Sequence, residues 1–245
     1  MIKITQEKLL SDNDHNELYY DNLLLGEDTK TIPKIEEFDT GDIILFSDIT
    51  YIPSRIIEWV TGSKYSHVGI ILKDPTFINP LLKGLYILES TGLSSIVDSE
   101  DNKRKTGVQI RKLENVCNDY NGAIFWRKLH ALRDEEFKRK ITEIHTKVHD
   151  KPYDVQPIDW LKSMFNDRYG SLQITSRFFC SALVTYIYDV LGFVASNTPW
   201  TIIRPKDLGT ENLATNRIKF VNCIVDNEVM IKSYDSYVHY LYNTY

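Results

Sequence analysis

The sequence predicts an α+β fold in which helices pack against a small antiparallel sheet. Short β-like runs alternate with turn formers through the first half of the chain, and two strongly patterned helices follow in the second half. The composition agrees with this fold class. A chain of 245 residues, 42% of them apolar and 26% charged, is typical of an ordered protein that can bury a sizeable core.

Five short runs predict the strands of the sheet. Each combines β-branched and aromatic residues, and each is bounded by residues that favour turns. Two further strands are expected late in the chain. The runs are Asp42–Phe46, Ser66–Leu72, Leu85–Leu88, Gly107–Leu113 and Ala123–Arg127, and the late strands are Ile218–Val225 and Val229–Lys232.

Two longer segments predict amphipathic helices. In the segment from Asp134 to Asp150, apolar residues recur at spacings of four, three and four, and acidic residues occupy its first turn. The segment Phe178–Leu191 also carries its apolar residues on one face, and Gly192 is suited to end it. Shorter helices are expected at Pro53–Gly62 and Pro157–Phe165.

Residues 1–37 read as an N-terminal extension of uncertain order, and residues 233–245 as a Tyr-rich tail. The extension carries many charges and turn formers. The tail is expected to dock on its own domain, and a protein partner stays open because exposed aromatic patches often mark contact surfaces. One helical face of the tail can be lined by Tyr234, Val238, Leu241 and Tyr245.

Charge and cysteine usage exclude several classes of protein. The net charge is −5, with 29 basic against 34 acidic residues, so the chain lacks the basic excess that attracts nucleic acid. The three cysteines lie far apart, which predicts neither a disulfide framework nor a zinc ribbon. No apolar run is long enough to cross a bilayer core of roughly 30 Å. We therefore expect no transmembrane segment and a cytoplasmic location.

Two residues stand out as candidates for chemistry. His67 lies near the start of a β-branched strand, two residues before Gly69, which leaves room for a close approach. Cys180 falls within the first turn of a predicted helix, where free N–H groups and a partial positive charge stabilise a thiolate. Glu89, on the expected neighbouring strand, could hold the imidazole. The alternatives are a core-filling cysteine and a structural histidine.

The motifs around these residues resemble a known superfamily. FDTGDIILF, SHVGIIL and FFCSALV are similar to the Gly-Asp strand, the His strand and the Cys-Ser helix of NlpC-type papain-like peptidases. Here the cysteine follows the histidine, which is the order of the circularly permuted branch that holds YiiX-like, poxvirus-related and lecithin retinol acyltransferase-like proteins. KPYD at 151–154 and RPKDL at 204–208 extend the resemblance.

The resemblance implies a permuted papain-like domain over residues 38–232 and a cysteine hydrolase activity. It implies Cys180 as nucleophile, His67 as general base and then acid, and Glu89 as the group that orients the imidazole. Tyr153 and Ser181 would bind substrate or the oxyanion. The expected substrate is a peptide, a lipid or a small amide or ester, no cofactor is needed, and a viral chain would act in the host cytoplasm or the virion.

Two other readings remain. A papain-like scaffold can keep these residues and serve as a binding or host-interaction protein. His145 and His149, four apart on a helix, could share a metal ion. The charged neighbours Lys147 and Asp150 favour a solvated helix face instead, so no metal site is expected.

Overall fold

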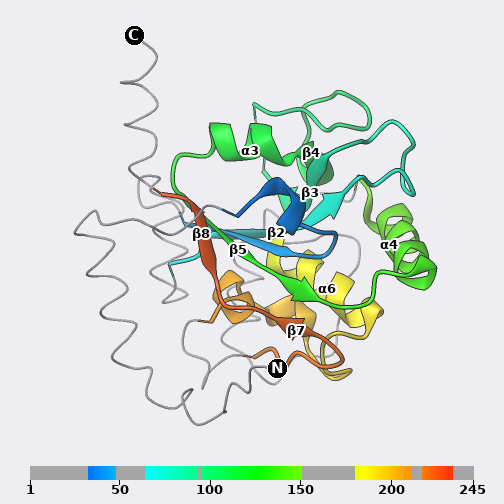
Figure 1. Ribbon diagram of the computed structural model, residues 1–245, viewed down its shortest axis with the longest axis vertical. Coiled ribbons are helices and arrows are strands. Elements are labelled where there is room, and N and C mark those ends of the chain that lie inside the picture. Colours follow the sequence, from blue (N-terminus) through cyan, green and yellow to red (C-terminus); the bar gives the residue numbers. More distant parts are fainter. Residues whose placement is uncertain (1–32, 48–63, 93–94, 151–179, 211–216, 234–245) are drawn as a thin grey trace, which may run out of the picture. The chain divides into compact units, whose positions relative to one another are not determined.

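The computed structural model describes residues 33–47, 64–92, 95–150, 180–210 and 217–233 (Figure 1). Everything below concerns the compact unit Lys34–Tyr245. Several expectations lie outside the described residues: the N-terminal extension up to residue 32, the helices at 53–62 and 157–165, Tyr153 with its KPYD segment, and the tail from residue 234.

A six-stranded sheet with antiparallel pairing organises the described part of the chain, in the order β4-β3-β2-β1-β5-β8. The strands that carry most of the pairing follow the predicted runs within a few residues. They are β1 (Ile43–Ser47), β2 (His67–Lys73), β3 (Leu85–Thr91), β4 (Gly107–Lys112), β5 (Ala123–Arg127) and β8 (Val229–Lys232).

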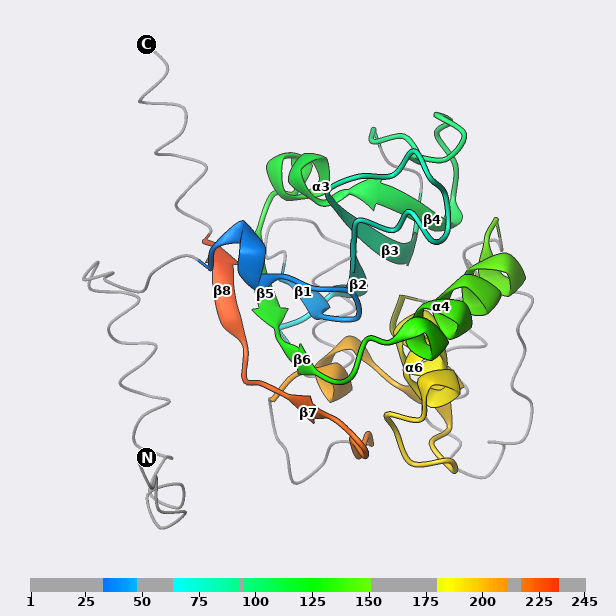
Figure 2. The same ribbon diagram turned by 45° about the vertical axis from the view of Figure 1, so that its right-hand side comes forward.

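Helices cover both faces of the sheet. The longer helices α4 (Glu135–Val148) and α6 (Cys180–Leu191) share one apolar cluster with inward residues of the strands. The short helix α3 (Leu113–Asp119) belongs to a second cluster. Figure 2 shows α3 and α6 on opposite sides of the sheet. The α+β fold class is therefore confirmed, and no described helix is long and apolar enough to span a membrane.

The start of α4 and the end of α6 fit their sequences, while the predicted start of α6 at Phe178 lies outside the described residues. Asp134 caps α4, because its carboxylate accepts the backbone N–H of Phe137 at 2.9 Å. Gly192 follows α6 with a φ of +78°, the left-handed conformation that suits a residue just past a helix. Short 3₁₀ turns complete the described helices at Ile35–Glu37, Trp200–Ile202 and Pro205–Leu208.

Gly41 and Asp42, which directly precede β1, form hydrogen bonds with helix α6 and with Trp126 and Leu129. Gly41 adopts a φ of +93°, and a Cβ there would lie 2.8 Å from Leu129 Cδ2, so the position favours glycine. Its carbonyl accepts the Tyr188 hydroxyl of α6 at 2.7 Å. Asp42 is buried, which raises its pKa, while hydrogen bonds from Leu129 N–H and Trp126 Nε1 oppose that rise.

Two elements differ from the sequence expectation. The helix α3 was not predicted, because only Leu113 and Val116 are buried in its seven residues and so short a pattern has no clear period. Of the expected strand Ile218–Val225, only the last two residues form a strand, β7 (Ile224–Val225). This strand pairs with β6 (Leu129–His130). Asn222 has a φ of +55°, which interrupts the extended backbone.

Candidate active site

His67 and Glu89 meet on neighbouring strands of the sheet. His67 is the first residue of β2, and Glu89 lies within β3, which pairs with β2. His67 Nε2 lies 2.5 Å from Glu89 Oε2. Glu89 is fully buried, and the side chain of His67 keeps 19% exposure. The structure therefore brings together the histidine and the carboxylate that the sequence analysis singled out.

Gly69 makes this approach possible. A Cβ at that position would lie 2.7 Å from Ile87 Cδ1 and 3.1 Å from Glu89 Cβ. Both distances are closer than packed side chains tolerate without moving. The space that Gly69 leaves open is thus filled by side chains of β3, including the base of the Glu89 side chain whose carboxylate contacts His67.

Arg111 fixes the other oxygen of Glu89, and the sequence analysis missed it. Its Nε and Nη2 lie 2.7 Å and 2.5 Å from Glu89 Oε1. Burial raises the pKa of Glu89, but the charge of Arg111 and the hydrogen bond to His67 bring that pKa down to about 2. The sequence does indicate the face of the strand on which Arg111 lies. Because Arg111 alternates with Val108 and Ile110, its side chain points away from the core that those two residues enter.

Cys180 lies beside the imidazole. It is the first described residue of α6 and is 6% exposed. Burial lowers the pKa of His67, yet the charge and hydrogen bond of the Cys180 sulfur, together with Glu89, raise that pKa to about 10. Because Nε2 faces Glu89, the remaining ring nitrogen, Nδ1, is the atom left for the sulfur.

The other two cysteines have no histidine among the causes that shift their pKa values. Burial raises the pKa of Cys117 to about 11, although the charge of Lys232 opposes this rise. Burial also raises the pKa of Cys223 to about 11; this residue packs against the apolar core, and its sulfur lies 3.7 Å from the carbonyl oxygen of Phe193. Both thiols are therefore protonated at neutral pH.

Ser181 and Tyr153 gain no support as site residues. The Ser181 side chain is buried, and its hydroxyl donates to the carbonyl of Ile203 at 2.6 Å, a contact that anchors α6. Tyr153 lies outside the described residues. An aromatic neighbour that the sequence analysis did not identify is Phe46, whose ring centroid lies 5.2 Å from that of His67.

The expectation of a solvated helix face at His145 and His149 is wrong for His145. That residue is buried, with 8% exposure, and the His149 side chain keeps 26%. Both rings face Glu100, which comes from the loop between β3 and β4. A contact between segments 45 residues apart cannot be recognised from the helical pattern. The exposure of His145 was therefore inferred from its charged neighbours alone.

Comparisons with known proteins add little to this picture. No protein-family model matches the chain, and a comparison with curated proteins finds no match. Five chains of solved structures do match. One is the crystal structure of metalloprotein yiiX from Escherichia coli O157:H7, with a TM-score of 0.44 and 18% identity over 80% of this chain and 98% of that one. Because this structural match is so distant, the α+β assignment rests on the chain's own strands and helices.

Proposed function

We propose that the chain is a cysteine hydrolase in which Cys180 is the nucleophile, His67 the general base and acid, and Glu89 the orienting carboxylate. The observation that supports this proposal is the position of the imidazole: its Nε2 is held by the buried carboxylate of Glu89, and the nearby sulfur of Cys180 helps to raise its pKa. Hydrolysis through a covalent thioester requires this set of groups.

Each group has a defined task in the proposed reaction. A positive imidazolium beside Cys180 stabilises its thiolate, which attacks the carbonyl carbon of an amide, ester or thioester. His67 then gives its proton to the leaving group, and an acyl-thioester remains on Cys180. In the second half, His67 takes a proton from water, the hydroxide oxygen attacks the thioester carbon, and the carboxylic acid leaves while the sulfur regains its charge.

Glu89 and Arg111 keep the imidazole in place during both halves. The carboxylate accepts from Nε2 and favours the protonated ring, while Arg111 keeps that carboxylate ionised although it is buried. Arg111 acts through Glu89 and is therefore a positioning residue. We further propose that residues 38–232 form a permuted papain-like domain, as the motif order suggests.

Thiol reactivity tests the proposal without knowledge of the substrate. With iodoacetamide at pH 7, Cys180 should be alkylated at least about tenfold faster than Cys117 or Cys223, as expected for a thiolate beside an imidazolium. Peptide mass spectrometry at several times would give the three rates. The variant His67→Ala should slow Cys180 to the rate of the others.

The exposed histidine His130, which contacts Asp226 at the surface, offers a matched control. His130→Ala should leave the alkylation of Cys180 unchanged. Equal rates for all three cysteines in the wild-type chain would contradict the hydrolase proposal and favour a scaffold that binds a partner through the same fold.

A further inference from the structure

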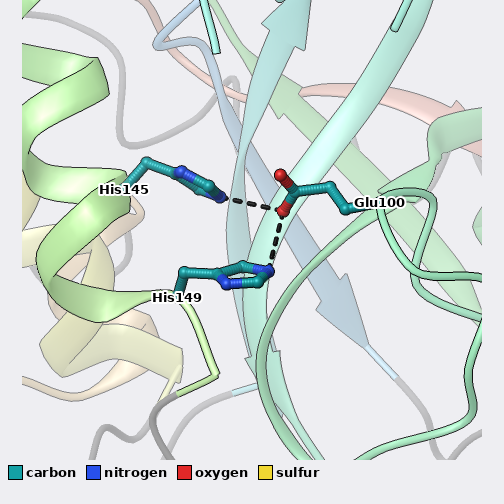
Figure 3. Close-up of side chains that lie close together, drawn as sticks. All are labelled: Glu100, His145 and His149. Atoms are coloured by element: carbon teal, nitrogen blue, oxygen red, sulfur yellow. Dashed lines mark hydrogen bonds and ion pairs between the residues drawn. The ribbon is translucent and has the colours of Figure 1, made fainter. Parts of the chain in front are cut away.

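Glu100, His145 and His149 form a second cluster of functional side chains, distinct in its residues from the proposed active site (Figure 3). His145 lies in the last turn of α4, and His149 is the residue that ends this helix. Four residues apart, the two rings share one face of the helix, with centroids 4.8 Å apart. Glu100 comes from the loop between β3 and β4.

The two histidine rings face the same oxygen of Glu100, Oε2. His145 Nε2 lies 2.9 Å and His149 Nε2 3.0 Å from Glu100 Oε2. Two imidazole nitrogens directed at one carboxylate, in a largely buried position, are a set of donors that transition metals prefer. In tetrahedral zinc sites with bond lengths of about 2.0–2.1 Å, neighbouring ligand atoms stand about 3.3 Å apart. The two nitrogen–oxygen distances need to lengthen by only a few tenths of an ångström to reach that spacing, and all three ligand atoms already lie within 4.8 Å of one another.

His149 Nε2 is poorly explained by protein contacts alone. This atom is buried and makes no well-aligned hydrogen bond with any residue that the structure describes, although Glu100 Oε2 is only 3.0 Å away. Its in-plane direction therefore passes beside the oxygen. A nitrogen that shares an ion with an oxygen points at the ion and not at the oxygen, so a bound cation accounts for this orientation.

The far side of the His149 ring is arranged as in metal sites. His149 Nδ1 lies 3.1 Å from Asp150 Oδ2. Histidines that bind metals commonly donate their second N–H to a carboxylate, which leaves the other nitrogen free to coordinate. Asp150 itself holds a φ of +58°, a conformation that few residues other than glycine adopt.

The loop that carries Glu100 is held in place by its own contacts. Asp98 is buried, and its Oδ1 accepts the backbone N–H of Glu100 at 2.8 Å. Its other oxygen lies 2.6 Å from Lys105 Nζ, and Lys105 also contacts Asp150. Asp98 and Asp150 therefore each contact a cation of the chain directly, whereas the direct contacts of the Glu100 carboxylate within the described residues are those with the two histidines.

We infer that Glu100, His145 and His149 bind a divalent transition-metal ion of the Zn²⁺ type, which links the end of α4 to the β3–β4 loop. The inference replaces the sequence expectation that no metal is bound. Three ligands leave a fourth tetrahedral position for water. The inference does not depend on the proposed hydrolase activity, because it uses none of the residues assigned to that reaction.

Metal content of the purified full-length chain tests the inference, with the affinity tag removed. After treatment with EDTA and dialysis, titration with ZnSO₄ in a calorimeter should show one tight site per chain. The variant Glu100→Gln should weaken zinc binding at least about tenfold, because a change in a residue that only contacts a metal ligand already costs about that much affinity. The double variant His145→Ala/His149→Ala should abolish the site.

His130→Ala is the matched control, since it removes an exposed histidine that also contacts a carboxylate. This variant should keep one zinc ion per chain. Thermal unfolding gives a second readout: added Zn²⁺ should raise the Tm of the wild-type chain and of His130→Ala, and should leave that of the double variant unchanged.

Two results would overturn the inference. One is a wild-type chain that binds no zinc after correct folding has been verified by circular dichroism. The other is a Glu100→Gln variant that binds as tightly as the wild type; this conservative change decides the matter even if the double variant fails to fold. Alkylation of Cys180 should be the same in Glu100→Gln and the wild type, so the two proposals fail separately.

Discussion

At the scale of single residues, the candidate active site is a line of alternating charges. Arg111 is positive, Glu89 negative, His67 positive when protonated, and Cys180 negative when ionised. A buried carboxylate such as Glu89 is costly unless each oxygen finds a partner, and here one oxygen faces Arg111 and the other His67. The charge of Arg111 therefore favours the ionised form of Glu89, and the charge of Glu89 favours the protonated form of His67.

The first prediction concerns the pKa of His67. Glu89→Gln keeps the shape of the side chain and removes its charge, so it should lower the pKa of His67 from its value of about 10 by at least about one unit. The Cε1–H resonance of His67, assigned by comparison with His67→Gln, can be followed by NMR from pH 5 to 11. An unchanged midpoint would show that Glu89 does not act on the ring.

The sequence pointed to the residues of the proposed site better than to their support. His67 and Cys180 belong to motifs whose order along the chain could be read directly, and Glu89 was chosen for its place on the expected neighbouring strand. Arg111 could not be selected in this way, because its importance depends on the register that sets Ile87 opposite Arg111 and Glu89 opposite Gln109. Register is a property of strand pairing, which a single sequence does not specify.

At the scale of elements, the pairing of β2 with β3 is what positions the imidazole. The two strands approach closely at Gly69, where Ile87 and Glu89 occupy the volume of a missing side chain. Glycine within a strand often marks such a close approach.

The second prediction is that Gly69→Ala destabilises the chain and slows the alkylation of Cys180. The added methyl group would lie 2.7 Å from Ile87 Cδ1, and overpacking of this kind costs about 1–3 kcal/mol. Gly92→Ala is the control, because no atom lies within 4 Å of a Cβ there. Urea unfolding should separate the two variants by at least about 1 kcal/mol, and equal stability would contradict the packing argument.

Elements with a clear period could be predicted, and those set by tertiary contacts could not. The period of α4 identifies its buried face, and the continuous apolar run of β2 marks it as a strand. The sequence gives no comparable signal for α3, since two buried positions are too few, or for the burial of His145, which depends on the distant loop around Glu100.

At the scale of the whole described unit, the proposed site depends on three segments that are far apart in the chain. β2 brings His67, β3 brings Glu89, and α6 brings Cys180, which follows His67 by more than a hundred residues. The apolar cluster shared by the sheet, α4 and α6 holds these segments together. Folding therefore creates the charge network, and the network in turn makes stability depend on pH.

The last prediction follows from the pKa of Glu89, which is about 2 in the folded chain and lies below its ordinary value of 4.5. A carboxylate with a lowered pKa stabilises the fold above pH 4.5, and this contribution is lost as the pH falls toward 2. Between pH 5 and pH 3, the free energy of unfolding should therefore fall by about 1–2 kcal/mol more in the wild type than in Glu89→Gln. Urea titrations at several pH values would measure both slopes. His67 stays protonated in this range, so parallel slopes would mean that the ionised carboxylate of Glu89 does not stabilise the fold.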